Sequence, residues 1–244
     1  MTGLEENLIA IQDEKNKKII PANIKNGVEI FGIVGNYEGV TITDSEDYQI
    51  CLDLSNEMLE NSEIKPYYEL DYLQTSGSQY IDTGIIPTNH KVEIKFKYLE
   101  AVNNTSLFGA TSTTYHLTWY SNRWYYACGN FEQNMSTTSC TTLQTVIFNN
   151  DNKKITMNGV EYGVTNGTSS ATINLLLFAR TDNMTGKVKA EFYYMKIYDR
   201  STNELVRNFI PVKDINGVVC LYDKVTEQFF YNIGSGNFIA GPQI

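Results

Sequence analysis

The stretch Lys91-Val92-Glu93-Ile94-Lys95-Phe96-Lys97-Tyr98 decides the fold class of this chain. Its even-numbered residues, from Val92 to Tyr98, are apolar or aromatic, and its odd-numbered residues, from Lys91 to Lys97, are charged. Successive side chains of a β-strand point to opposite faces of a sheet. This period of two therefore predicts a strand with one buried face and one lysine-rich solvent face.

Segments of the same kind continue on both sides of that strand, separated by Gly, Asn, Ser and Asp turns such as Asn158-Gly159. No long amphipathic helix interrupts them. Many short antiparallel strands predict an all-β fold, and we expect a two-sheet antiparallel jelly-roll sandwich over residues 67–244. The further strands expected are Ser106–Ala110, Tyr115–Tyr120, Trp124–Cys128, Thr145–Asn149, Lys154–Met157, Ile173–Ala179, Glu191–Asp199, Val218–Tyr222 and Gln228–Asn232.

Charge and aromatic content divide the 244 residues into an acidic leader and a neutral body. Residues 1–66 hold 13 acidic side chains and 5 lysines, whereas residues 67–244 hold 15 acidic and 14 basic side chains. Non-specific nucleic-acid binding needs a basic surface, so no nucleic-acid partner is expected. No run of 18 uncharged apolar residues exists and the N-terminus lacks an apolar signal region, so neither membrane insertion nor secretion through a cleaved signal is expected.

The first residues predict a short helix. Leu4, Leu8 and Ile11 are spaced four and three apart, which gives one narrow apolar seam, and Thr2 can cap the helix start. A helix of about three turns is marginal alone, so we expect this seam to hold a homo-oligomer, most simply a trimer. The alternative is a helix packed on its own body.

A glycine-punctuated block follows, in which short apolar pairs predict very short strands joined by tight turns. Its residues 17–35 resemble a module of phage and prophage virion proteins of Gram-positive bacteria, with the pattern K-I-I-P-x-N-I-K-x-G-V-x-I-x-G-V-x-G. Ile33-Val34 departs slightly from that pattern. The resemblance implies an oligomeric virion component that attaches to other virion proteins through residues 1–40. Residues 41–66, with seven acidic side chains and one lysine, are expected to be an acidic connector.

A second resemblance covers nearly all of the body. Four blocks in order are similar to concanavalin-like domains of the laminin-G and pentraxin type, which implies glycan or protein binding and, in some members, Ca²⁺ at a loop rim. The blocks are Tyr80–Gly84, Ile155–Val160, Leu177–Arg180 with Phe192–Arg200, and Leu221–Lys224 with Gly234–Phe238.

The sequence offers little for catalysis. Only His90 and His116 are present, and no metalloprotease, serine-hydrolase or phosphate-loop motif occurs. A jelly-roll glycosidase is the sharpest enzyme alternative, and its two carboxylates would have to lie on one strand face, about 5–5.5 Å apart for a retaining mechanism. The pair Glu69 and Asp71 is the one candidate in the body. It lies at the domain's start and is interpreted as a solvent-exposed pair, so no enzyme activity is expected.

No cofactor is expected either. Asp182 and Asn183 follow Arg180 in a predicted loop and carry oxygen ligands that suit Ca²⁺, but two residues do not fill six to eight positions, and a plain turn is favoured. The four cysteines, at positions 51, 128, 140 and 220, match no metal or redox spacing and are expected to be reduced and mostly buried.

The densest aromatic stretch, Tyr115–Tyr126, predicts a hairpin that turns at Ser121-Asn122-Arg123. Alternation allows the core to take only one face, and we assign Leu117 and Trp119 to it. The side chains then left outside form the candidate ligand-binding set, because aromatic rings stack on sugars while Arg and His donate hydrogen bonds. This set is His116, Tyr120, Arg123 and Tyr125. The alternative is that these residues only form cross-strand pairs that stiffen the sheet.

Taken together, the sequence favours a phage virion fibre or appendage protein, made in the host cytoplasm, whose lectin-like body adheres to host-surface glycan. A head fibre or capsid decoration protein with a structural role is the first alternative. A jelly-roll glycosidase is the second.

Overall fold

The computed structural model describes residues 29–30, 33–34, 65–111, 115–129, 132–135, 139–163, 165–180 and 187–244. The predicted helix with Leu4, Leu8 and Ile11 lies outside these residues, as do Asp182 and Asn183 of the candidate Ca²⁺ loop. The chain divides into two units, Met1–Pro66 and Tyr67–Ile244. In the first unit, β1 (Glu29–Ile30) pairs antiparallel with β2 (Ile33–Val34).

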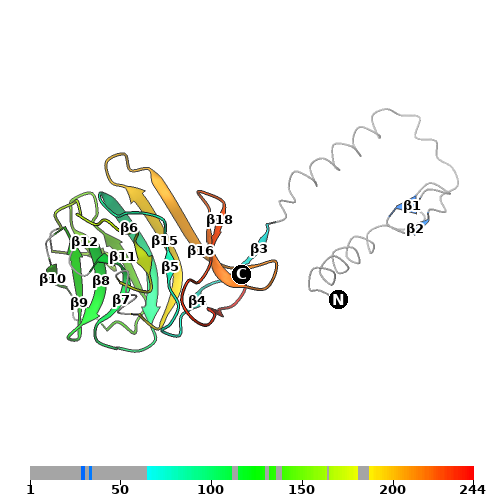
Figure 1. Ribbon diagram of the computed structural model, residues 1–244, viewed down its shortest axis with the longest axis horizontal. Helices are drawn as coiled ribbons and strands as arrows, with labels where there is room; N and C mark the ends of the chain where they lie inside the picture. The colour runs from blue at the N-terminus through cyan, green and yellow to red at the C-terminus, as the bar shows by residue number, and fades with distance from the viewer. Residues whose placement is uncertain are drawn as a thin grey trace. The chain divides into compact units, whose positions relative to one another are not determined.

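The second unit, called the body below, is a sandwich of two antiparallel sheets (Figure 1). The six-stranded sheet runs in the order β10 (Glu132–Asn134), β9 (Arg123–Cys128), β8 (Tyr115–Tyr120), β7 (Thr105–Thr111), β14 (Leu176–Leu177), β5 (Ile81–Asp82).

The eleven-stranded sheet has a main path of eight strands: β13 (Val160–Tyr162), β12 (Ile155–Met157), β11 (Gln144–Phe148), β6 (His90–Tyr98), β15 (Ala190–Asp199), β16 (Leu205–Asp214), β17 (Val219–Asp223), β18 (Gln228–Phe230). Three short strands complete it: β3 (Tyr67–Glu69) on β16, β4 (Leu73–Gln74) on β15, and β19 (Ile239–Ala240) on β4. The predicted all-β, two-sheet antiparallel sandwich is confirmed. Among the described residues, none forms a helix long and apolar enough to span a bilayer.

The core lies between the two sheets and is rich in aromatic rings. The alternation predicted for β6 is confirmed, since the side chains from Val92 to Tyr98 on its apolar face are fully buried. Across the core, the ring of Trp124 in β9 meets Phe96 and Tyr98 edge-on, with centroids 5.4 Å and 5.2 Å away. Aromatic packing therefore holds the hairpin β8–β9 against the opposite sheet and fixes the backbone that carries its outward side chains.

The observed strands differ most from the predicted ones at β16 and at Ile173–Ala179. The long strand β16 was not predicted, because both of its faces are covered: Phe209 lies in the main core, while Ile210 and Val212 contribute to a second cluster on the other face. Such a strand shows no alternation. The segment Ile173–Ala179 was predicted as one strand but pairs only at Leu176–Leu177. Phe178 adopts a left-handed φ of 67°, which ends the extended conformation there.

Candidate functional site

The hairpin β8–β9 turns through two residues, Ser121 and Asn122, with φ angles of 50° and 57°. Two successive positive φ angles define the type I′ turn that matches the twist of a hairpin. Arg123, which was predicted within the turn, is instead the first residue of β9 and lies opposite Tyr120. The backbone thus places these two side chains side by side at the hairpin tip.

A neighbouring loop supports this tip. The backbone N–H of Asn104 donates to the carbonyl oxygen of Trp119 at 2.8 Å, and the N–H of Asn122 donates to the side-chain oxygen of Asn103 at 3.4 Å. The turn is therefore held against the start of β7.

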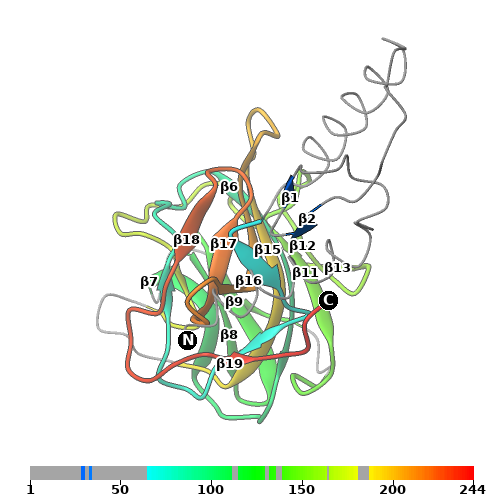
Figure 2. The ribbon, with the colours of Figure 1, turned by 90° about the vertical axis from the view of Figure 1, so that its right-hand side faces the viewer.

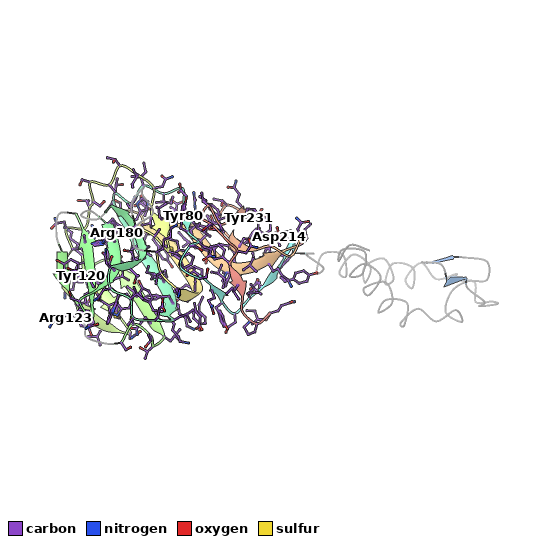
Figure 3. The ribbon with its side chains drawn as sticks, turned by 60° about the horizontal axis from the view of Figure 1, so that its bottom comes forward. Tyr80, Tyr120, Arg123, Arg180, Asp214 and Tyr231 are labelled. Carbon is purple, nitrogen blue, oxygen red and sulfur yellow. The ribbon has the colours of Figure 1, made fainter. Side chains whose placement is uncertain are left out.

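The inward face of the hairpin is occupied by the side chains that the alternation predicted. Leu117, Trp119 and Trp124 face the core and are buried. On the outward face, the Tyr120 side chain is 50% exposed, Arg123 is exposed and Tyr125 is half-buried. Figure 3 shows Tyr120 and Arg123 together at one extremity of the body.

The aromatic rings of the outward face form a connected row. The Tyr120 and Tyr125 ring centroids are 6.1 Å apart at an interplanar angle of 66°, and Tyr125 and His116 are 6.4 Å apart at 67°. Edge-to-face pairs of this kind are mutually stabilising and leave a ring face at the end of the row. Tyr120, at the solvent end, therefore combines an accessible ring with the adjacent guanidinium of Arg123.

His116 was predicted as an accessible member of the site, and that prediction was wrong. It lies on the outward face of the sheet but is only 2% exposed. Its Nδ1 lies 3.0 Å from the hydroxyl oxygen of Thr118, which in turn lies 2.8 Å from the hydroxyl of Ser106. Burial, and to a lesser extent the positive charge of Arg180, lower the pKa of His116 to about 3, so the ring is neutral at pH 7. His116 packs against the ring of Tyr125 and is not itself exposed to solvent.

Arg180 is the residue of this face that sequence reasoning missed. A Cβ added to Gly109 in β7 would lie 2.9 Å from Cγ of Arg180 and 3.0 Å from Cβ of His116. The absence of a side chain at Gly109 therefore lets Arg180 lie along the sheet beside His116. From there its Nη2 donates to the side-chain oxygen of Asn104 at 3.3 Å. A lone glycine inside an apolar strand is the sequence signal that could have indicated such a close approach.

A cavity of about 150 Å³ lies beside the loop that precedes β7, lined by Ser76, Glu100, Val102, Lys187 and Lys189 among others. Pockets that enclose small-molecule ligands are typically about 300–1,000 Å³. This cavity is therefore smaller than a usual small-molecule site.

The carboxylate pair of the glycosidase alternative does not lie on one strand. β3 ends at Glu69, and Asp71 lies beyond it in a bend. The backbone N–H of Asp71 donates to the carbonyl oxygen of Pro242 at 2.8 Å. Glu69 also lies 3.4 Å from the ammonium of Lys224. Within the described segments, no group of three or more His, Cys, Asp or Glu side chains could hold a metal ion.

The cysteines of the body agree with their predicted state. Cys128, Cys140 and Cys220 are reduced and buried. Desolvation raises their pKa values to about 12, 11 and 12. Because the thiolate is the reactive form, none of the three is suited to nucleophilic chemistry.

Comparisons with known proteins add a distant structural similarity. No protein-family model matches the sequence, and no curated protein matches it. Among solved structures, a crystal structure of a protein from Bacteroides ovatus, provisionally assigned to carbohydrate binding, aligns with a TM-score of 0.43 and 10% sequence identity. The alignment covers 70% of this chain and 62% of that structure, so the chain spans less than two thirds of its length. A similarity at this TM-score carries no conclusion about the ligand.

Proposed function

We propose that this chain is a non-catalytic adhesion protein of a phage or prophage virion, whose body binds host-surface glycan through the outward face of the β8–β9 hairpin. Residues 1–40 would attach it to the particle as an oligomer, most simply a homotrimer.

The observation that carries this proposal is the position of the hairpin within the body. Figure 3 places Tyr120 and Arg123 at one end of the body and Asp214 at the other. Asp214 lies opposite Tyr67 in the pairing of β16 with β3, and β3 is the first strand of the body. A body held through its N-terminal side would therefore present the hairpin away from the attachment point. This is the arrangement that an adhesion domain needs.

The chemistry of the hairpin fits a sugar. The half-exposed ring of Tyr120 can stack on the apolar face of a pyranose, and the exposed guanidinium of Arg123 can donate to hydroxyl or acidic substituents. Single contacts of this kind are weak, and display in several copies would raise the apparent affinity by avidity.

The glycan site is tested on an array of bacterial cell-wall polysaccharides and synthetic glycans, with full-length protein. Tyr120→Ala should reduce binding to the recognised glycan by about tenfold or more, equivalent to the loss of about 1.4 kcal/mol. Tyr198→Ala is the matched control, because Tyr198 is a half-buried tyrosine of the other sheet. If Tyr120→Ala binds as the parent does, or if both variants lose binding equally, the hairpin is not the site.

The absence of catalysis is part of the proposal and has its own test. The protein is incubated with the polysaccharide that it binds, and released reducing sugar is measured. We expect none. Release that is lost in Glu69→Ala or Asp71→Ala would replace adhesion with the glycosidase alternative.

The structural alternative, a head fibre or capsid decoration protein, predicts a different outcome. Such a protein would be found on particles by immunogold labelling but would bind no glycan on the array. Labelling at the tail tip together with array binding favours adhesion.

A further inference from the structure

β6 and β15 are the two central strands on the main path of the eleven-stranded sheet, and they lie side by side between β11 and β16 (Figure 2). Alternate residues of both strands are buried in the main core, so the residues between those buried positions lie on the outer face. The charged residues of this outer face are Lys91, Glu93, Lys95, Lys97, Glu191 and Lys196. Their neighbours on the flanking strands, such as Thr145 of β11 and Asn208 of β16, are uncharged. The strand pair therefore carries two more cations than anions, in a chain with a net charge of −9.

A β-bulge turns two consecutive tyrosines of β15 toward this outer face. The register with β6 shifts between Phe192 and Tyr194, so Tyr193 is the extra residue. Phe192 and Met195, on either side of the two tyrosines, belong to the main core. Tyr193 and Tyr194 are only half-buried, and β-bulges re-aim side chains in this way next to functional sites.

The two tyrosine rings are held in place by hydrogen bonds. The Tyr193 hydroxyl donates to Oε2 of Glu191 at 3.0 Å, and the Tyr194 hydroxyl donates to Oε1 of Glu93 at 2.9 Å. Burial, and then the hydrogen bond to the glutamate, raises the pKa of each tyrosine to about 12, so both hydroxyls keep their protons at pH 7. Tyr193 also packs on Tyr72, with the ring centroids 5.6 Å apart. The rings thus form a fixed base for the side chains that lie over them.

Each of the two rings carries one lysine. The ammonium of Lys95 lies 5.0 Å from the ring centroid of Tyr193, and the ammonium of Lys196 lies 5.5 Å from the ring centroid of Tyr194. A cation over an aromatic face is attracted to it, which holds the flexible lysine side chain in one position. The two lysines, called the lysine pair below, are diagonal neighbours across the strands, about 7–8 Å apart at the backbone.

The lysine pair differs from the other two lysines of this face, which are bound to acidic side chains. The Lys91 ammonium lies 2.9 Å from Oδ1 of Asp151, and the Lys97 ammonium lies 3.2 Å from Oε2 of Glu191. Among the described residues, neither ammonium of the lysine pair forms an ion pair or donates a hydrogen bond. Both lysines are half-buried, so their charged ends are accessible to a ligand.

From these observations we infer that the lysine pair binds the anionic groups of an acidic glycan polymer, which makes the outer face of β6 and β15 a binding face separate from the hairpin. An ammonium donates charge-assisted hydrogen bonds to carboxylate and phosphate oxygens alike. Because the tyrosine rings already hold both side chains, less side-chain entropy is lost on binding.

A glycan fits this face better than a nucleic acid does. Nucleic acids need a broad basic surface, whereas the lysine pair supplies two charges on a protein of net charge −9. An acidic glycan carries its charges among hydroxyl groups. The half-buried side chains of Thr145 and Asn208 on the flanking strands offer donors and acceptors for those hydroxyls.

Isothermal titration of the full-length protein with short oligomers tests this inference. The probes are an oligogalacturonate, which carries carboxylates, a glycerol-phosphate oligomer, which carries phosphates, and a neutral dextran oligomer. We expect the parent to bind at least one anionic probe, more weakly at high salt because partly exposed charges are screened, and not to bind dextran. The anionic probe that binds identifies the recognised group. Failure of both anionic probes, equal binding of dextran, or equally tight binding of single-stranded DNA would overturn the inference.

Removal of the two charges locates the site. Lys95→Gln/Lys196→Gln should reduce the affinity for the anionic probe by about tenfold or more, since two charge-assisted contacts are lost. The matched control is Lys153→Gln/Lys189→Gln, which removes the same charge at two exposed positions elsewhere on the body. Equal losses in the two double variants would contradict the inference. Circular dichroism checks the fold, and Lys196→Gln alone replaces the first double variant if that variant is unfolded.

Two further variants separate this face from a structural role and from the hairpin. The exposed carboxylate of Asp71 is close enough to Tyr193 to add to its raised pKa, so it opposes an anion there. Asp71→Asn should therefore raise the affinity about two- to threefold, and an unchanged or lower affinity contradicts the inference. Tyr120→Ala should bind the anionic probe as the parent does. If Tyr120→Ala loses that binding while the lysine variant keeps it, the inference is wrong and the proposed hairpin site stands.

Discussion

Trp119 and Tyr120 are neighbours in the sequence, yet their substitution should affect different properties. Trp119 is 4% exposed, and its ring meets Trp124 edge-on at 5.3 Å. Trp124 in turn packs on Phe96 and Tyr98 of the opposite sheet. Trp119→Ala would therefore leave a cavity at the centre of an aromatic cluster. Removal of a buried aromatic side chain costs about 3–5 kcal/mol of unfolding free energy.

Tyr120→Ala should cost much less. Half of the Tyr120 side chain is already in water. Full burial of a large apolar side chain contributes about 1.5–3 kcal/mol, so the half that is buried contributes about 1 kcal/mol. For a body of 178 residues, 1 kcal/mol corresponds to about 2–4 °C in melting temperature. We expect a decrease of at least about 6 °C for Trp119→Ala and of no more than about 4 °C for Tyr120→Ala.

Urea unfolding followed by tryptophan fluorescence measures both effects. The chain has two tryptophans, Trp119 and Trp124, and both lie in the body, so the signal reports on the body alone. In Trp119→Ala the remaining Trp124 is the reporter. The glycan array then shows whether Tyr120→Ala loses binding while it stays folded. If Tyr120→Ala is the more destabilised variant, or if Trp119→Ala leaves stability unchanged, the assignment of the two hairpin faces is wrong.

Three further outcomes are expected. The pKa of His116 is about 3 in the folded body, against an ordinary value of 6.5. Between these two values only the unfolded chain takes up the proton, so lowering the pH to 5 should cost about 2 kcal/mol of folding stability. The difference between the urea midpoints at pH 7 and pH 5 should therefore be smaller in His116→Gln than in the parent. An unchanged pH dependence in that variant would show that His116 is not the group responsible. Gly109→Ala should lower the free energy of unfolding by about 1–3 kcal/mol in the same urea assay, because the new Cβ overlaps Arg180 and His116. An unchanged stability would mean that Arg180 does not lie across this glycine. Cys128, Cys140 and Cys220 should resist iodoacetamide at pH 8 in the folded protein and react in urea, as mass spectrometry of digested protein would show; alkylation of the native state would contradict their burial.

The sequence was most informative where one face of a strand is buried and the other is in water. Val92 to Tyr98 alternate for that reason, and the sandwich followed from this pattern. In β8, Tyr120 is exposed, whereas His116 and Thr118 on the same outward face are buried, so the alternation there placed the inward side chains correctly but not the exposure of the outward ones. β16 has apolar contacts on both faces, so its sequence carries no alternation to detect.

Placement of single side chains in the site was less predictable, because it depends on segments distant in the chain. Arg180 lies against Gly109, which is 71 residues away, and burial by such neighbours turned His116 from an expected ligand contact into an internal support. Leu4, Leu8 and Ile11 lie outside the described residues, so the trimer remains a prediction.

The most direct test of the glycan-binding claim is isothermal titration of the full-length protein with the best oligosaccharide from the array. A small soluble ligand removes avidity, so the titration measures one site per chain. We predict saturable binding by the parent and by Tyr198→Ala, and a dissociation constant raised about tenfold or more in Tyr120→Ala. Equal affinity of the parent and Tyr120→Ala, with both proteins folded, would contradict the account.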